Sequence, residues 1–568
     1  MLFFKFHKLH TAIKKNLLTY FVFVLITIIS YLGLVNSFYQ QDEWHAVGRI
    51  MVQGPSYIYS EIPLLGNILL ESRPFARSLN LIFFGYFALN TFPLFLFVVF
   101  THSLNSLLVY FITIRLTKKK FVSFLAVLFF VLNDTSKQAV LWYGSVTGTL
   151  LSTTGIVLAV LFYLKYLDKR EKRYVSFSLF SLVLSLGFKE TGYFLFFLLP
   201  VLDFTYEYYK NRKIRFCKTP ILILFIGIKL VSVKFVNIFF IAKEYSGYVG
   251  SHSEGALTRL IWAGVTYPIE TFSQAFIPDR IFYPFSQKLT YVIFPYFESV
   301  NASVQVSEKV VLELLSLFAG FIIVTLVLSV LIKRKNKFPL VFSTLFYLLG
   351  FLPFIFIIKS SAYLESRYYY SLIIPIVFFL AMFFEGVFGI FKKIKNRNIA
   401  RFLLITGTCV YIALLALHTK YIHYQLELQT EKAQLQKPIL ASLYSIHPLL
   451  SKKQVFYIDS NRDFVVEGNP LPFQQGVGYT ILVYYLAHGA DPSFKQFLAD
   501  NYFWEIENTG YKEKSGYGFG FYSDLKSLKK GIKKNKLNVN AVEAFYYDSK
   551  SAKMKNISRE VRAEIIYE

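Results

Sequence analysis

Long apolar runs, separated by short polar breaks, occupy the first three quarters of the chain. A helix needs about 20 apolar residues to cross roughly 30 Å of hydrocarbon. Runs close to that length recur along the chain, so the pattern predicts about eleven transmembrane helices within residues 1–424. They lie near residues 16–36, 92–115, 120–133, 144–164, 174–188, 190–206, 217–240, 309–332, 338–358, 368–391 and 402–424.

The pattern changes in the tail, residues 425–568, where long apolar runs stop and Lys and Glu are mixed. "QVFYIDS" predicts a buried strand, "YTILVYYLAHG" a strand or an amphipathic helix, and "RAEIIYE" a final strand. "DPSFKQFLADNY" predicts a helix that opens with Pro in its first turn. We therefore expect a separate soluble α/β or α+β domain, with a role in recognition or packing.

Composition supports the membrane class. Of the 568 residues, 55% are hydrophobic and only 17% are charged, which excludes an ordinary soluble protein. The two cysteines, Cys217 and Cys409, lie in or at predicted spans. They predict no disulfide framework, and the sequence shows no CxxC or His-rich metal signature.

The formal charge of +26 could suggest a nucleic-acid partner, but the placement of the charge argues against one. Six basic clusters fall at every second break between spans, which is the positive-inside pattern. The pattern predicts a multi-pass protein of the cell membrane, with a cytoplasmic N-terminus and an extracytoplasmic C-terminal domain. The first span resembles an uncleaved anchor. The clusters are at residues 14–15, 115–120, 165–173, 210–218, 333–337 and 392–401.

In this topology, the first extracytoplasmic segment along the chain is a long loop, residues 37–91. Its opening stretch "SFYQQDEWHAVG" brings Asp42, Glu43 and His45 within four positions. The acidic pair is either a solvated feature of a helix exit or the source of a catalytic base. The other predicted outer segments are 134–143, 188–190, 241–308, 359–367 and the tail.

Two arginines follow in the same loop. Arg73 and Arg77 are four residues apart, a spacing that places them on one helical face, and Pro74 suits a helix start. Their guanidinium groups either anchor the chain to lipid headgroups or form a fork for a phosphate.

Three further outer segments carry charges. Asp134 fits a helix N-cap or a binding residue. Lys189 and Glu190 lie between two apolar runs, where charges are costly and indicate either function or an ion pair. Arg367 stands beside three tyrosines in "YLESRYYYSLIIP".

Together these segments resemble the GT-C glycosyltransferases of the protein O-mannosyltransferase type and their tetratricopeptide-fused relatives. The resemblance covers roughly residues 10–425. It rests on the Asp-Glu pair that opens the first loop and on four later stretches. These are "SRPFARSLN" with "THSLNSLLVYFITIRL", then "DTSKQAVLWYGSVTGTLLSTTG", "LSLGFKETG" and "YLESRYYYSLIIP".

The resemblance implies a polyprenyl-phosphate sugar donor and inverting transfer, on the extracytoplasmic face, to a hydroxyl of a protein, lipid or glycan. It implies Asp42 as the catalytic base, with Glu43 as its neighbour and second candidate. The remaining candidates would bind the donor phosphate or sugar, with Arg73 and Arg367 favoured. They are Arg73, Arg77, Asp134, Lys189, Glu190 and Arg367.

The chain also departs from these relatives. It has "ESR" where they usually place Glu and Arg adjacent, and it lacks their repeat array or β-trefoil insert. The acceptor therefore stays open. A divalent metal near Asp42, Glu43, His45 and Asp134 is conceivable, because related GT-C enzymes hold one with acidic outer loops. Since no clear second diacid is present, we expect no cofactor and no metal.

Two other classes compete. A transporter or flippase for a lipid-linked glycan typically carries ionisable residues near the bilayer midplane and inverted repeats, whereas these charges gather at one face. A non-catalytic membrane anchor for the tail domain would leave Asp42 and the Lys189–Glu190 step unexplained.

Overall fold

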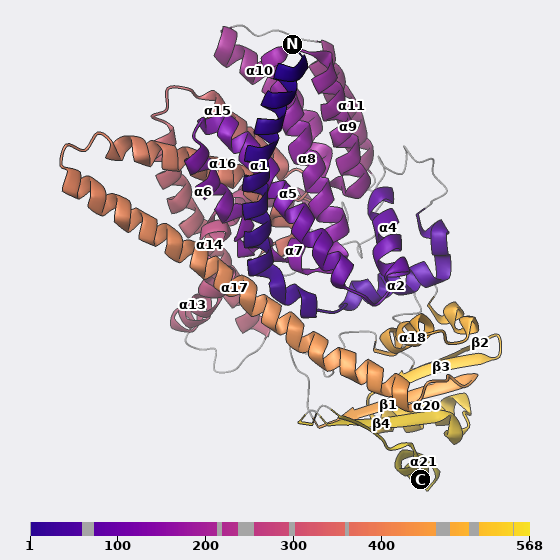
Figure 1. Cartoon of the computed structure of the whole chain (residues 1–568). Helices are drawn as coiled ribbons and strands as arrows, with labels where there is room; N and C mark the ends of the chain where they lie inside the picture. The colour runs from indigo at the N-terminus through magenta and orange to yellow at the C-terminus, as the bar shows by residue number, and fades with distance from the viewer. Residues whose placement is uncertain are drawn as a thin grey trace. The chain divides into compact units, whose positions relative to one another are not determined.

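The computed structural model is mostly helical, with a small sheet near the C-terminus (Figure 1). Side chains within 2–16, 41–42, 211, 234–235 and 302–305 are not described, although these residues belong to helices. The structure describes residues 2–58, 73–212, 218–236, 255–294, 302–357, 363–461, 477–498, 510–548, 550–551 and 553–567.

The chain divides into two compact units. The span unit comprises Met1–Leu32, Ile62–Ala76 and Phe97–Tyr424. The tail unit comprises Gly33–Glu61, Arg77–Leu96 and Gln425–Glu568. Much of the predicted first outer loop therefore groups with the tail, which the sequence pattern did not predict.

Each of the eleven apolar segments contains a helix among its described residues. One of them, α17, begins in the span unit and continues past residue 424 to Ile446. The helices in these segments are α1 (Leu2–Tyr31), α5 (Phe92–Thr117), α6 (Lys120–Val131), α8 (Tyr143–Lys169), α9 (Lys172–Phe188), α10 (Leu195–Asn211), α11 (Lys218–Val236), α14 (Ala302–Leu331), α15 (Phe338–Gly350), α16 (Tyr369–Phe391) and α17 (Arg397–Ile446). Shorter or more polar helices lie between them: α4 (Pro74–Asn80), α7 (Lys137–Leu141), α12 (Ala256–Phe276) and α13 (Asp279–Ile293).

Six helices in the described part of the chain are long and apolar enough to cross a membrane, and a bent pair that starts with α6 would make seven. Several of them expose large apolar side chains, which suits contact with lipid. On α14, for example, Phe318 and Phe321 are 67% and 64% exposed. A helical membrane protein is therefore supported, while the count of eleven spans stays a prediction.

Helices α12 and α13 fall within residues 241–308, where the sequence pattern gave only an outer loop. Helix α12 packs closely on α14, because a Cβ on Gly320 would lie 2.2 Å from the carbonyl oxygen of Ile269. The carbonyl of Pro268, inside α12, accepts a hydrogen bond from the Tyr347 hydroxyl at 2.5 Å. Only a small residue fits at Gly320.

Small residues also bring α8 and α9 together. A Cβ on Gly155 would lie 2.8 Å from the carbonyl oxygen of Ser181, and the hydroxyls of Ser152 and Ser185 are 3.0 Å apart. Close approach at Gly and Ser, joined by hydrogen bonds between helices, is typical of helix packing in membranes. This contact fixes the end of α9, where the candidate residues Lys189 and Glu190 follow.

The tail unit contains a mixed five-stranded sheet in the order β2-β3-β1-β4-β5. The central strand β1 runs parallel to β3 and β4, and the edge strands β2 and β5 are antiparallel to their neighbours. The predicted buried strand is thus confirmed. The strands are β1 (Lys453–Ser460), β2 (Tyr511–Lys514), β3 (Tyr517–Tyr522), β4 (Val542–Asp548) and β5 (Lys553–Asn556).

Helices complete the tail unit: α18 (Val477–Ala487), α20 (Leu525–Asn535) and α21 (Ser558–Ile566). The helical alternative for "YTILVYYLAHG" is correct, and a short helix η9 (Pro492–Phe497) begins at the expected proline. The prediction of a final strand is wrong. Residues of "RAEIIYE" lie in α21, where Arg562 donates to the Val542 carbonyl and to Glu543 on β4, so the helix packs against the sheet.

The first-loop helix α2 (Gln41–Gln53) packs against α18 within the tail unit. A Cβ on Gly48 would lie 2.1 Å from the Tyr479 hydroxyl oxygen, so a larger residue there would force the tyrosine ring to shift. The same tyrosine donates a 3.4 Å hydrogen bond to the His45 carbonyl. Helix α2, with its acidic pair, is therefore held on the tail domain rather than being a free loop.

Candidate functional site

Lys189 is the buried centre of the candidate site in the span unit. It follows α9 in an extended conformation and precedes the short helix η5 (Glu190–Phe194), so it lies outside the helices of membrane-spanning length. The residue is only 6% exposed. Its ammonium donates a 2.9 Å hydrogen bond to Thr149 Oγ1 and lies 5.2 Å from the ring centroid of Tyr368.

Glu190 binds Arg73 in a two-pronged ion pair. Arg73 Nε and Nη2 lie 2.8 and 2.6 Å from the two carboxylate oxygens of Glu190. Arg73 has a positive φ of 47° and α4 begins only at Pro74, so the expected helix start is confirmed. The expectation that Arg73 and Arg77 share a helical face is wrong, because the backbone turns left-handed before the helix.

Arg367 reaches the site from the short helix η8 (Ser366–Tyr368). Its guanidinium is 2.5 Å from Glu365 and stacks over Trp142, 4.5 Å from the ring centroid. Ser366 fixes the turn, because its hydroxyl donates to the Thr135 carbonyl at 2.7 Å. The serine that separates Glu and Arg in "ESR" therefore has a structural role.

The charges of these residues influence one another. Burial, together with the positive charges of Arg73 and Arg367, lowers the pKa of Lys189 to about 7, against the opposing effect of the two glutamates. Burial disfavours the charge of Glu190, but Arg73 and Lys189 outweigh that effect and hold its pKa below the usual range. We call Arg73, Lys189 and Arg367 the cation cluster.

The cation cluster has a chemical consequence. When Lys189 is protonated, three cations face two carboxylates, so the site carries one net positive charge. The lowered pKa of Lys189 reflects the free-energy cost of that charge in a buried place. An anion that entered the site would offset the cost. Guanidinium and ammonium groups are the usual protein ligands of phosphate.

Asp134 is buried and paired within the span unit. Its carboxylate lies 2.5 Å from His418 Nδ1 and 3.5 Å from the ammonium of Lys137. The N-cap of the short helix η4 (Asp134–Ser136) is Asn133, whose side chain accepts from Thr135 N, so the expected N-cap role of Asp134 is wrong. Through His418, Asp134 joins η4 to α17.

The acidic pair of the first loop lies at the start of α2 in the tail unit. Glu43 is 1% exposed, and its Oε2 accepts a 2.5 Å hydrogen bond from the backbone N–H of Gln40. This reciprocal arrangement is a capping box, which stabilises the start of a helix. Asp42 belongs to the same first turn, and its side chain is outside the described residues.

Arg77 also belongs to the tail unit. Its guanidinium lies 5.8 Å from the ring centroid of Tyr57, a cation–π contact. The two arginines that the sequence pattern placed together therefore fall in different units.

The His-x-x-Asn span supplies a buried polar network. His102 Nδ1 lies 2.7 Å from the Tyr370 hydroxyl, and Asn105 donates to that hydroxyl and to the Leu150 carbonyl. Thr154 donates to Asn105 at 2.7 Å. The network joins α5, α8 and the start of α16, directly after η8, and so helps to position Arg367.

Sequence reasoning missed two neighbours of Lys189, namely Thr149 and Tyr368. The signal was weak. Thr149 is one of many small polar residues in "GSVTGTLLSTTG", and the tyrosine run after Arg367 is also typical of an interfacial aromatic belt. Only the fold shows which of these side chains lie beside the buried ammonium.

Within the described residues, no three His, Cys, Asp or Glu side chains gather in a way that could hold a metal ion. The conceivable metal group is divided between the units, because Glu43 and His45 lie in the tail unit and Asp134 in the span unit. In addition, the carboxylate of Asp134 is engaged by His418 and Lys137.

No protein-family model matches the chain, and no curated protein matches its sequence. The likeness to GT-C glycosyltransferases therefore rests on the residues themselves.

Proposed function

We propose that the chain is an integral membrane glycosyltransferase with a GT-C-like fold. It moves a sugar from a polyprenyl-phosphate donor to an acceptor hydroxyl on a protein, lipid or glycan, with inversion, at the extracytoplasmic face. The observation that carries the proposal is the cation cluster. Arg73, Lys189 and Arg367 come from three distant parts of the sequence, yet the fold gathers them. Arg73 is ion-paired with Glu190, the residue next to Lys189, and Lys189 and Arg367 each lie 5.2 Å from the ring centroid of Tyr368.

The first chemical requirement is stabilisation of the leaving group. When the bond between the sugar and the phosphate breaks, negative charge grows on the phosphate oxygens. The cation cluster offers the buried ammonium of Lys189, in a place where electrostatic stabilisation is stronger than in water. Two more exposed guanidinium groups lie beside it, and Glu190 and Glu365 hold them in position. The rings of Trp142 and Tyr368 limit the motion of Arg367 and Lys189.

The second requirement is a base that accepts the proton of the attacking hydroxyl. We propose Asp42 for this role. Glu43 is a poorer choice, because its carboxylate is buried and caps α2. The packing of α2 on α18 supports a related role for the tail domain, which would hold the base in place and offer an acceptor surface.

The reaction is tested with the full-length protein in membranes. A panel of labelled polyprenyl-phosphate sugars should include at least one donor whose label moves to endogenous protein, lipid or glycan. A chain lacking the cation cluster, with Arg73, Lys189 and Arg367 all replaced by Gln, is the negative control. If no donor in the panel gives more transfer with the wild type than with this control, the proposed function is wrong.

The proposed topology gives a separate prediction. A reporter fused to the C-terminus should score as extracytoplasmic, and one inserted within residues 333–337 as cytoplasmic, because basic loops stay inside. Protease protection of the same fusions provides an independent reading. A cytoplasmic C-terminus would put the tail unit, including Asp42, on the wrong side for this reaction.

Replacing Arg73 or Arg367 with Lys should weaken donor binding by about tenfold, although the charge is retained, because an ammonium cannot form the planar fork. Donor affinity and turnover are measured separately for each variant. Arg77→Lys is the matched control, since it makes the same change on the same sequence segment at a guanidinium that lies over the Tyr57 ring. Equal affinities for all three variants and the wild type would return Arg73 and Arg367 to a purely structural role.

A further inference from the structure

A pocket of about 630 Å³ lies where the start of α6, the end of α16 and the start of α17 meet. Its residues all belong to the span unit. Its three cations come from two of the basic clusters of the sequence, residues 115–120 and 392–401, at the end of the helices opposite to the predicted outer loops. The pocket is therefore separate from the cation cluster and is not explained by the proposed function.

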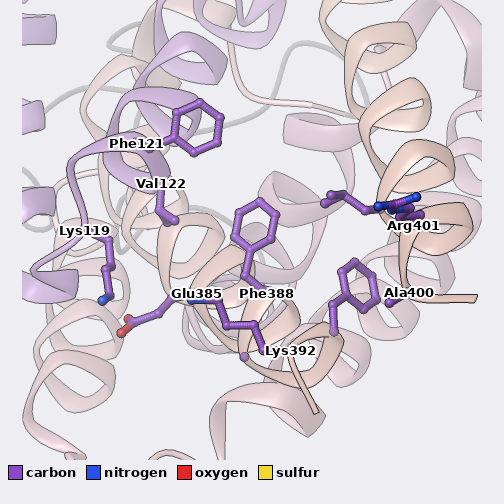
Figure 2. Close-up of a pocket in the computed structure, with 11 residues that line it drawn as sticks. Lys119, Phe121, Val122, Glu385, Phe388, Lys392, Ala400 and Arg401 are labelled. Carbon is purple, nitrogen blue, oxygen red and sulfur yellow. The ribbon is translucent and has the colours of Figure 1, made fainter. Parts of the chain in front are cut away.

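The pocket has two kinds of wall. Lys119, Lys392 and Arg401 supply three cations, while Phe121 and Phe388 contribute to an apolar wall. In the view of Figure 2, Lys119 and Arg401 flank Phe388 from opposite sides. A soluble anion would need only the cations, whereas a molecule with both an acidic head and hydrocarbon would contact both walls.

One carboxylate also lines the pocket, and its charge must be accounted for. Glu385 accepts a 2.7 Å hydrogen bond from Arg334 Nη1, and both side chains are at most 29% exposed. This ion pair offsets the negative charge of Glu385. The lining therefore keeps an excess of positive charge that a phosphate complements.

We propose that this pocket binds an anionic phospholipid of the bilayer, with the headgroup phosphate at Lys392 and Arg401 and an acyl chain along Phe388. The location fits, because α16 and α17 both have membrane-spanning length and the pocket lies at their joined ends, where headgroups are found. Basic pockets between transmembrane helices are known sites for acidic headgroups. The volume lies within the usual range for pockets that bind small molecules.

The first test removes charge. The full-length protein is purified in neutral detergent, and phosphatidylglycerol or phosphatidylcholine with identical acyl chains is added. We expect phosphatidylglycerol to raise the unfolding temperature and to be retained in native mass spectra, and phosphatidylcholine to do neither. The double variant Lys392→Gln with Arg401→Gln should lose the temperature shift and retain about tenfold less phosphatidylglycerol. Lys393→Gln with Lys395→Gln removes the same charge from residues outside the pocket lining, and should behave as the wild type.

The second test fills the pocket without changing charge. Gly389 lines it, and a Cβ there would meet no atom within 4 Å, so Gly389→Leu should fold while occupying the space. Gly407 on α17 has equally open surroundings and lies outside the lining, so Gly407→Leu is the matched control. Only Gly389→Leu should lose retention of phosphatidylglycerol. Equal responses to both lipids, or equal retention by the two glycine variants, would mean general annular lipid only and would overturn the proposal.

Discussion

Replacing Asp42 with Asn should abolish sugar transfer while leaving the protein folded and its donor affinity nearly unchanged. The amide keeps the shape of the side chain but cannot accept the proton of the attacking hydroxyl. A general base contributes about 10²–10⁴ in rate. Single-turnover transfer from the labelled donor measures the loss, and donor binding with thermal unfolding of the same sample shows that only the chemical step has changed.

The neighbouring residue supplies the control. Glu43→Gln should keep most activity, because glutamine can still accept from the Gln40 N–H and close the capping box. Glu43→Ala should lower the free energy of unfolding by about 1 kcal/mol, the typical value of a helix cap. Full turnover in Asp42→Asn together with its loss in Glu43→Gln would mean that the base is the other carboxylate. Full turnover in both would remove the first loop from the mechanism.

The sequence predicted the positions of the membrane-length helices well, because each is encoded locally by a run of apolar residues. Helix α12 was missed for a physical reason. Its stretch mixes Arg259, Glu270 and small polar residues with apolar ones, and Glu270 is only 1% exposed in the fold. Burial within the protein lets a helix carry polar groups that a lipid-facing helix could not, and that burial depends on tertiary contacts.

The final element of the tail was predicted with the wrong secondary structure, for a different reason. The short run of β-branched and charged residues in "RAEIIYE" fits a strand as well as a helix, since periodicity cannot decide over so few positions. The packing decides it, because Val561 is buried and Arg562 binds β4 from a helix. Local pattern alone had no access to either contact.

The candidate site was predictable in part. Charged residues between apolar runs drew attention to Lys189 and Glu190, and the fold joins them with Arg73 and Arg367. The separation of Arg73 from Arg77 was not predictable from spacing. A left-handed residue before Pro74 breaks the helical register, and a four-residue interval carries meaning only inside a continuous helix.

The cation cluster makes Lys189 the residue whose replacement tells most about the leaving group. Lys189→Met keeps the length and the apolar stem of the side chain but removes the ammonium that Thr149 accepts from. If that ammonium stabilises charge on the departing phosphate, turnover should fall by about 10²–10³, as it does when a preorganised donor is removed from a developing anion. Steady-state and single-turnover rates with the accepted donor measure the change.

The same residue predicts a pH dependence of donor affinity. The pKa of Lys189 is lowered to about 7, so its ammonium is lost as pH rises through that value. A bound phosphate favours the ammonium, and above about pH 7 binding must take up a proton. Affinity should therefore be nearly constant below pH 7 and fall as pH rises above it.

Variants separate this dependence from general effects of pH on the protein. Lys189→Met should bind donor weakly and without the pH dependence, and Lys189→Arg should bind without it because the guanidinium stays charged. Lys137→Met is the matched control, since it removes another buried cation, one paired with Asp134 and Asp279. It should keep the wild-type pH profile. A wild-type profile in Lys189→Met would show that the leaving phosphate does not contact this ammonium. The phosphate-binding site that acts together with the base Asp42 would then have to lie elsewhere.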